Sequence, residues 1–224
     1  MKNIAVIGAG ISGLFIANLF KKNPNYQINI FEKNTSITCR EGYGLQLSVN
    51  SIKLLNQIGF KNLKKNNKSN PKKIDFYSMS SSKKICELNI SEFNSMDCKY
   101  TTLKRSTLIN FLKKGLDDNI KTDYDIKNID LQNNEIKLSF ENSKDIKCDY
   151  LIISDGVFSK SKNLLSHNKL KPKYNNSLAI RGVISKNRNN INNENISLFL
   201  GSNFHQVIYP TNPYGDLNFI AIMK

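Results

Sequence analysis

The chain has 224 residues, enough to bury about 70% of its unfolded surface in one large or two small domains. Its formal net charge is +15, but the basic residues come with an excess of Asn, as in Lys64-Lys65-Asn66-Asn67-Lys68, and no aromatic residues interleave these runs. A nucleic-acid partner is therefore not expected. No apolar run reaches 18 residues, so no transmembrane segment is expected either.

The cysteines and the N-terminus indicate a compartment. Cys39, Cys86, Cys98 and Cys148 are scattered without a CxxC pair, a pattern that predicts neither a metal site nor a disulfide framework. The N-terminal apolar run contains three glycines, ends in Lys21-Lys22 and lacks a small-residue cleavage site, unlike a signal peptide. We expect a cytoplasmic protein.

The first element is a buried strand over residues 2–7, followed by a glycine turn and a helix over residues 11–22. Gly8 permits a tight turn, Gly10 allows close approach of a pyrophosphate, and Gly13 allows the helix to pack on the strand. The free N–H groups of the first helical residues, Ile11 and Ser12, favour an anion there. The turn therefore predicts a phosphate site.

A second strand, residues 27–31, ends at Glu32, nineteen positions after Gly13. A carboxylate there can accept hydrogen bonds from both hydroxyls of an adenosine ribose, which favours a dinucleotide site over an ordinary strand-to-helix turn. Glu32 also argues against a 2′-phosphate, and Lys33 adjoins the same site. Arg40, in the following loop, either clamps the cofactor or is simply exposed.

Later segments alternate between helical and strand patterns. Apolar spacing predicts helices over residues 49–58 and 107–116. A buried parallel strand over residues 150–153 delivers Asp155 and Gly156 at its carboxyl end, where ligands bind in open α/β sheets. Further strands are expected over residues 74–79, 84–88, 120–124, 126–131, 135–140, 145–148, 178–185, 196–200, 204–209 and 217–223.

These elements predict an α/β fold with two domains interleaved in sequence. A Rossmann-like nucleotide-binding domain is expected over residues 1–72 and 99–176. An antiparallel β-sheet domain is expected over residues 73–98 and 177–224.

Four segments together resemble the flavoprotein aromatic monooxygenases of the p-hydroxybenzoate hydroxylase fold, especially the salicylate hydroxylase-like branch. Strands near Arg181-Gly182 and His205-Gln206 also look like those of that family's substrate domain. The four segments are the glycine turn with Glu32, Gly42-Tyr43-Gly44-Leu45-Gln46-Leu47 with Leu54-Leu55 and Ile58-Gly59, Leu103-Lys104-Arg105-Ser106-Thr107-Leu108, and Asp149 to Ser159 around Asp155-Gly156.

The resemblance implies FAD bound along Gly8 to Gly13, Glu32, Arg105 and the Asp155-Gly156 pair, with NAD(P)H visiting only to reduce it and O2 as co-substrate. The implied reaction is hydroxylation of an aromatic, phenolic acid-like small molecule. Strand alternation places His205 and Tyr209 on one face. If that face looks at the flavin, both can reach a substrate hydroxyl and are the candidate catalytic residues, with His205 as the base for a phenol proton. The alternatives are a surface histidine and a tyrosine that only packs.

The sequence departs from the family pattern at several positions, so other interpretations of its function stay open. Ser154 replaces an alanine and Lys162 an arginine, and an ammonium cannot reproduce a bidentate guanidinium. The family's later Gly-Asp motif would lie beyond Lys224, so we expect an incomplete or shortened enzyme that needs a complementing polypeptide for turnover. The alternatives are hydroxylation or epoxidation of a prenylated quinone precursor or isoprenoid, a catalytically inactive FAD-binding fragment, and a basic phosphate-binding module. The oligomeric state is not indicated.

Overall fold

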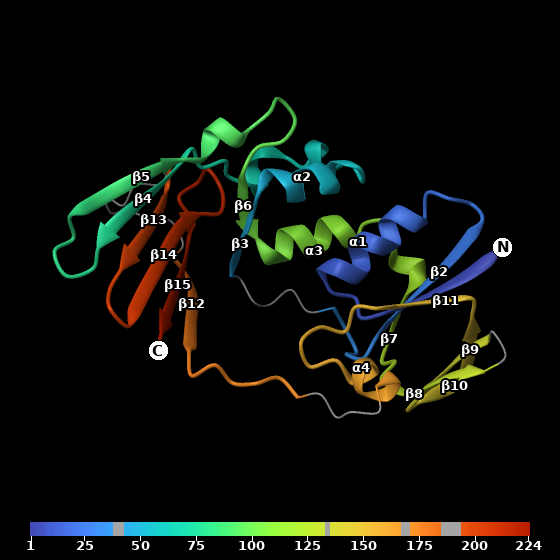
Figure 1. Ribbon diagram of the computed structural model, residues 1–224. Coiled ribbons are helices and arrows are strands. Elements are labelled where there is room, and N and C mark those ends of the chain that lie inside the picture. The colour runs from blue at the N-terminus through green and yellow to red at the C-terminus, as the bar shows by residue number, and fades with distance from the viewer. Residues whose placement is uncertain (38–42, 133–134, 167–170, 185–193) are drawn as a thin grey trace. The chain divides into compact units, whose positions relative to one another are not determined.

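In the computed structural model, the residues described are 1–37, 43–132, 135–166, 171–184 and 194–224. The chain divides into two compact units, each built from two separate stretches (Figure 1). Unit 1 comprises Met1–Thr38 and Ile109–Lys173, and unit 2 comprises Cys39–Leu108 and Tyr174–Lys224. These boundaries differ from the predicted domains, because residues 43–72 and 99–108 belong to unit 2.

Unit 1 contains a parallel sheet in the order β11-β1-β2-β7. The predicted strand–turn–helix is confirmed, since β1 leads through the glycine turn into α1. Residues Ile4 to Ile7 of β1 are buried, as expected for a central strand covered on both faces. The bounds are β1 Lys2–Ile7, α1 Ile11–Phe20, β2 Tyr26–Glu32, β7 Ile120–Thr122 and β11 Tyr150–Ile153.

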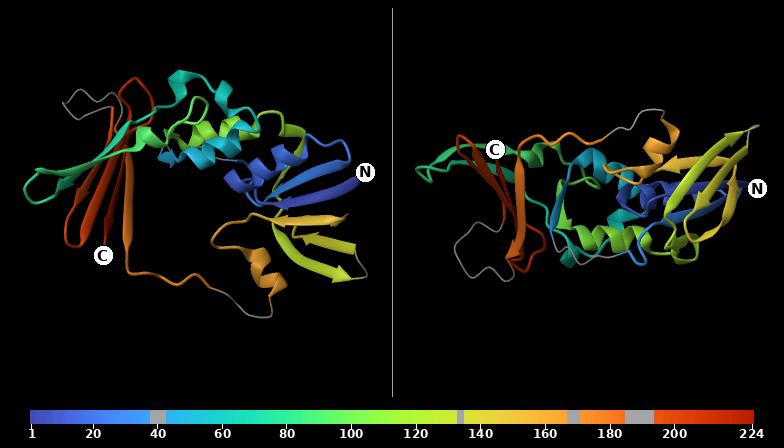
Figure 2. Two further views of the ribbon diagram at one scale, coloured as in Figure 1. Left: turned by 45° about the horizontal axis from the view of Figure 1, so that its top comes forward. Right: turned by 90° about the horizontal axis from the view of Figure 1, so that it is seen from below.

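An antiparallel sheet, in the order β10-β9-β8, forms a further layer of unit 1 (Figure 2). Alternation along β1 divides its side chains between two layers: Val6 lies beside Gly13 of α1, while Ala5 and Ile7 pack with Phe31 and Leu138. The predicted three-strand meander is confirmed. The bounds are β8 Ile126–Gln132, β9 Glu135–Phe140 and β10 Ser143–Cys148. Unit 1 also contains α4 Lys160–Leu165 and a 3-10 helix, Asp117–Asn119.

Unit 2 contains a six-stranded sheet in the order β12-β15-β14-β13-β4-β5. The prediction of a purely antiparallel sheet is wrong at one place, since β13 and β4 pair in parallel. β4 and β13 belong to the two separate stretches of chain that build unit 2. No hairpin therefore connects them and sets their relative direction. The bounds are β4 Lys73–Ser78, β5 Lys84–Asn89, β12 Leu178–Ile184, β13 Ile196–Leu200, β14 Phe204–Pro210 and β15 Leu217–Met223.

A two-stranded sheet of β3 and β6 completes unit 2, and no sequence pattern predicts it. Each strand has only four residues, too few for alternation to show. A Cβ on Gly44 would lie 2.9 Å from atoms of Tyr209, Thr211 and Asn218, so β3 passes close to the large sheet only because residue 44 is glycine. The bounds are β3 Gly44–Leu47, α2 Val49–Asn56, β6 Thr101–Lys104 and α3 Arg105–Lys113, with 3-10 helices Phe60–Asn62, Lys65–Asn67 and Ile90–Phe93.

Among the described residues, no helix combines the length and the apolar character needed to span a bilayer.

Candidate functional site

The three glycines of the turn between β1 and α1 have different local constraints. Gly8 has φ +98°, and a Cβ there would lie 2.5 Å from the carbonyl oxygen of Ser154. A Cβ on Gly13 would overlap the carbonyl oxygen of Gly8. A Cβ on Gly10 would meet no protein atom within 4 Å. Packing therefore explains Gly8 and Gly13, whereas Gly10 faces open space that a ligand can fill.

The first turn of α1 presents unpaired donors beside Gly10. The helical bonding begins with Leu14, whose N–H donates to the Gly10 carbonyl over 3.0 Å. Gly10 is the N-cap, with extended backbone and no side-chain cap, and the first turn contains no acidic residue. Within the described chain, the N–H groups of Ile11 and Ser12 therefore remain available to an anion, which the helix dipole also favours.

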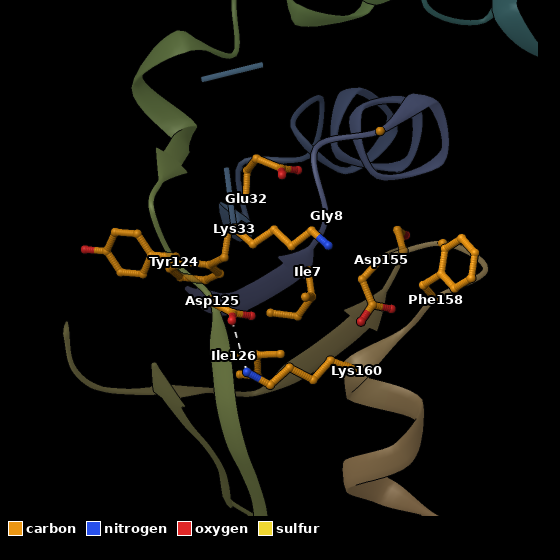
Figure 3. Close-up of a pocket in the computed structure, with 14 residues that line it drawn as sticks. Ile7, Gly8, Glu32, Lys33, Tyr124, Asp125, Ile126, Asp155, Phe158 and Lys160 are labelled. Atoms are coloured by element: carbon orange, nitrogen blue, oxygen red, sulfur yellow. Dashed lines mark hydrogen bonds and ion pairs between the residues drawn. The ribbon is translucent and has the colours of Figure 1, made fainter. Parts of the chain in front are cut away.

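A pocket of about 440 Å³ opens at the carboxyl ends of the parallel strands in unit 1 (Figure 3). The predicted residues that line it are Gly8, Gly10, Glu32, Lys33, Asp155 and Gly156. They come from the ends of β1, β2 and β11, and parallel strands place these ends at one edge of the sheet. The structure therefore brings most of the predicted cofactor residues together.

Glu32 is fixed by hydrogen bonds to the glycine turn and to its own loop. The Ala9 N–H donates to Glu32 Oε2 over 2.9 Å, and the Asn34 N–H and Nδ2 donate to Oε1 over 3.1 and 2.8 Å. A carboxylate has about four lone-pair sites and three are used here, so the group still has capacity for a ribose hydroxyl, at Oε2. These bonds hold the carboxylate in place before any ligand binds.

Asp155 supports the loop that faces the glycine turn. Its Oδ2 accepts from the Ser161 N–H over 3.0 Å in the first turn of α4. Burial raises the pKa of the carboxyl, but hydrogen bonds from Ser159 and Ser161 outweigh burial and hold the pKa below its usual range. Asp155 is therefore ionised, and it has a local capping role besides any contact with a cofactor. Its Oδ1 is buried without a partner among the described residues.

A more open hollow of about 640 Å³ adjoins this pocket and shares Asp155 and Gly156 with it. Ser12 and Lys162 line the hollow, not the first pocket. The Lys162 N–H donates to Ser159 Oγ over 2.9 Å, which caps α4. The predicted phosphate residue Ser12 and Lys162, the predicted departure from the family pattern, therefore line the same hollow.

Some residues that line the first pocket, Tyr124, Asp125 and Lys160, lie outside the motif segments. Lys160 Nζ lies 3.0 Å from Asp125 and 3.4 Å from Glu141, so a single ammonium is shared by two carboxylates, of which Asp125 lines the pocket. Tyr124 also lines the pocket, and Phe158, which is 82% exposed, lines it on the other side, next to Asp155 (Figure 3). An apolar pair after an Asp-Gly turn, Val157-Phe158, was the available signal for this part of the site.

Arg105 lies in unit 2, where it shares an aromatic neighbour with a second arginine. Its guanidinium is 5.8 Å from the Tyr43 ring centroid, and that of Arg181 is 5.1 Å from the same ring. The Arg105 N–H donates to the Tyr43 carbonyl over 2.9 Å. Two cations on one ring make this part of unit 2 suited to an anionic group. The role of Arg105 toward FAD stays a prediction, and Arg40 lies outside the described residues.

The two predicted catalytic residues have different environments in β14. His205 is half-buried and pairs with Leu200 and Ile222 of the neighbouring strands. Tyr209 is 1% exposed and packs with Ile90 and Ile196 in the core of unit 2. Burial raises the pKa of Tyr209 to about 12. The structure therefore favours the packing role for Tyr209 over a catalytic one, while His205 stays a candidate.

Comparison with known proteins gives results on two levels. A family model described as an NAD(P)-binding Rossmann-like domain matches residues 6–41, which include the glycine turn and Glu32. No curated protein sequence matches the chain.

Solved structures share the fold. HpxO of Klebsiella pneumoniae, complexed with FAD and uric acid, is 15% identical with a TM-score of 0.88, and the match covers 99% of this chain and 56% of HpxO. The 2,6-dihydroxypyridine-3-hydroxylase of Arthrobacter nicotinovorans is 16% identical with a TM-score of 0.81 over 100% of this chain and 56% of the hydroxylase. A salicylate hydroxylase in a substrate complex is 17% identical, with a TM-score of 0.82, and the corresponding coverages are 100% and 56%.

The chain therefore has the fold of these proteins over nearly its whole length, and it spans somewhat more than half of theirs. The resemblance to the flavoprotein aromatic monooxygenases that the sequence motifs indicate is confirmed at the level of the fold.

Proposed function

We propose that this chain binds FAD and belongs to a flavin-dependent monooxygenase that hydroxylates an aromatic substrate with NAD(P)H and O2. One observation carries the proposal. Gly10 alone among the three turn glycines faces open space, beside free helix N–H groups and a pocket that contains the Glu32 carboxylate. A pyrophosphate fits the open space beside Gly10 and the helix N–H groups, and an adenosine ribose fits the Glu32 carboxylate.

The residues of unit 1 would bind and orient the cofactor. The N–H groups of Ile11 and Ser12 would hold the pyrophosphate, and Glu32 would accept from the ribose. Asp155, kept ionised by its hydrogen bonds, would accept from a hydroxyl on the opposite side of the pocket. When bound, FAD supplies the redox chemistry that takes electrons from NAD(P)H and activates O2 for transfer of one oxygen atom.

The substrate side of the proposal rests on unit 2 and on the proteins with the same fold. The named hydroxylases act on salicylate and 2,6-dihydroxypyridine, and HpxO was crystallised with uric acid. A hydroxylated ring of this kind becomes more nucleophilic when it loses a proton. An imidazole nitrogen of His205 would accept that proton from the ring hydroxyl.

Two measurements on the full chain test the proposal. Quenching of flavin fluorescence during titration should give saturable FAD binding. NAD(P)H oxidation, assayed with this chain and with any complementing polypeptide, should then increase when a phenolic acid such as salicylate is added. Failure to bind FAD would refute the proposal as a whole. FAD binding without any stimulation of NAD(P)H oxidation would instead favour the inactive fragment, and stimulation only by a prenylated quinone precursor would favour that substrate class.

A further inference from the structure

A second pocket, of about 410 Å³, lies entirely within unit 2. It is bounded by α2, by the 3-10 helices Phe60–Asn62 and Lys65–Asn67, and by the segment that precedes β6. The Lys-Asn run of residues 64–68, which the flavin chemistry does not use, forms part of its wall. We call it the lysine pocket, after the four basic residues that line it: Lys61, Lys65, Lys68 and Lys99.

These four lysines lack acidic partners. None of them forms an ion pair with a carboxylate of the described residues, whereas Lys73, Lys84 and Lys160 elsewhere do. One carboxylate, that of Asp97, also lines the pocket. Four ammonium groups against one carboxylate leave the described lining of the lysine pocket with a net positive charge, so an anion entering it would be attracted by the summed field.

Lys68 is the most enclosed of the four. Its ammonium lies 5.2 Å from the centroid of the Phe60 ring, and its side chain is half-buried. Burial, and then the neighbouring charge of Lys65, lower the pKa of Lys68 below its usual range. A bound anion would relieve both effects, because it would neutralise the two ammonium groups together.

The rest of the lining mixes apolar and polar residues, and hydrogen bonds tie its segments together. Ile52 and Phe60 are buried and form an apolar floor. The backbone groups of Ser69 and Thr102 exchange two hydrogen bonds of 2.8 and 2.9 Å, and Asn56 Nδ2 donates to the Asp97 carbonyl over 2.8 Å. The walls are therefore fixed before a ligand binds, which lowers the entropic cost of binding.

We propose that the lysine pocket binds an organic phosphate, with the phosphate on the lysines and the apolar part of the ligand against Ile52 and Phe60. A phosphate monoester carries about 1.5 to 2 negative charges at neutral pH and three acceptor oxygens, which suits several point-like ammonium groups better than one carboxylate would. The phosphate belongs either to a free ester or to a lipid headgroup. Met96 lines the pocket with 92% of its surface exposed, so it is available to contact acyl chains.

Titration with phenyl phosphate by calorimetry tests the free-ester source. The Gly10→Val chain is used beside the wild type, so that binding at the glycine turn is separated from binding at the lysine pocket. We expect saturable binding in both proteins. Lys65→Gln with Lys68→Gln should weaken it at least about tenfold, since two charged contacts are lost. The matched control Lys114→Gln with Lys127→Gln removes two charges from unit 1 and should change the affinity less than about twofold.

Sedimentation with vesicles tests the lipid source. Vesicles of phosphatidic acid in phosphatidylcholine should carry the protein down, pure phosphatidylcholine should not, and Met96→Ser should weaken sedimentation without affecting phenyl phosphate. Lys61→Gln with Lys99→Gln, both exposed, provides a second variant should the first fail to fold. Absence of binding to both probes, or an equal loss in the unit 1 control, would overturn the proposal. Neither the phenyl phosphate titration nor the vesicle sedimentation depends on FAD binding.

Discussion

Replacing Gly10 with valine should abolish FAD binding while leaving the fold intact. The residue has φ −78°, which any amino acid adopts, and its Cβ position is open, so no protein atom opposes the side chain. Valine is a poorer N-cap than glycine, a cost of up to about 1 kcal/mol in the free energy of unfolding. The side chain would fill the space through which a pyrophosphate reaches the helix N–H groups.

The expected loss of affinity follows from those contacts. Two charged hydrogen bonds of about 1.5–3 kcal/mol each amount to about 3–6 kcal/mol, or a Kd about 10²- to 10⁴-fold higher. The assay is a flavin fluorescence titration, with thermal unfolding followed by circular dichroism.

Gly13→Ala is the matched control, because its Cβ would overlap the Gly8 carbonyl oxygen and should lower Tm directly. Unchanged FAD affinity in Gly10→Val would refute the assignment of this turn. A loss of Tm in Gly10→Val as large as that in Gly13→Ala would also refute the assignment, because Gly10 would then be required for packing alone.

Four further predictions concern the side chains of Glu32, Asp155, Tyr209 and His205. Glu32→Ala should weaken FAD binding by about 1–3 kcal/mol in the same titration, and an unchanged Kd would exclude a ribose contact. Because hydrogen bonds hold the pKa of Asp155 below its usual value, its ionised form stabilises the fold. That contribution is complete above the unfolded pKa and is lost as pH falls through the folded pKa, so the stability difference between wild type and Asp155→Asn in urea should shrink on acidification from pH 7. Burial raises the pKa of Tyr209 from 10.0 to about 12, so its neutral form stabilises the fold, and this contribution is lost as pH rises across that interval. Tyr209→Phe should make the alkaline loss of stability less steep, and an identical profile would contradict the burial. His205→Ala should slow oxygen transfer about a hundredfold or more while flavin reduction is little changed, and equal losses in the two half-reactions, separated by stopped flow, would indicate damaged packing instead.

The sequence by itself determined the local elements and the centre of the site. The strand, glycine turn and helix of residues 2–20 depend on spacings within a few residues, and so does the acid at the end of β2. The strands of the large sheet were predicted to within a residue or two, because apolar alternation is a local property of each strand. The convergence of Gly10, Glu32 and Asp155 at one edge follows from the rule for parallel strands.

The tertiary structure decided which elements pair and which faces are covered. β3 and β6 pair although α2, β4 and β5 lie between them in the sequence, and β4 joins β13 in parallel. No local pattern specifies either contact. Alternation placed His205 and Tyr209 on one face, but only packing on Ile90 and Ile196 showed that the Tyr209 end of that face is core. The lysine pocket likewise depends on segments about 40 residues apart. Pairing and burial are long-range properties, because they depend on where distant segments meet and not on the residues beside them in sequence.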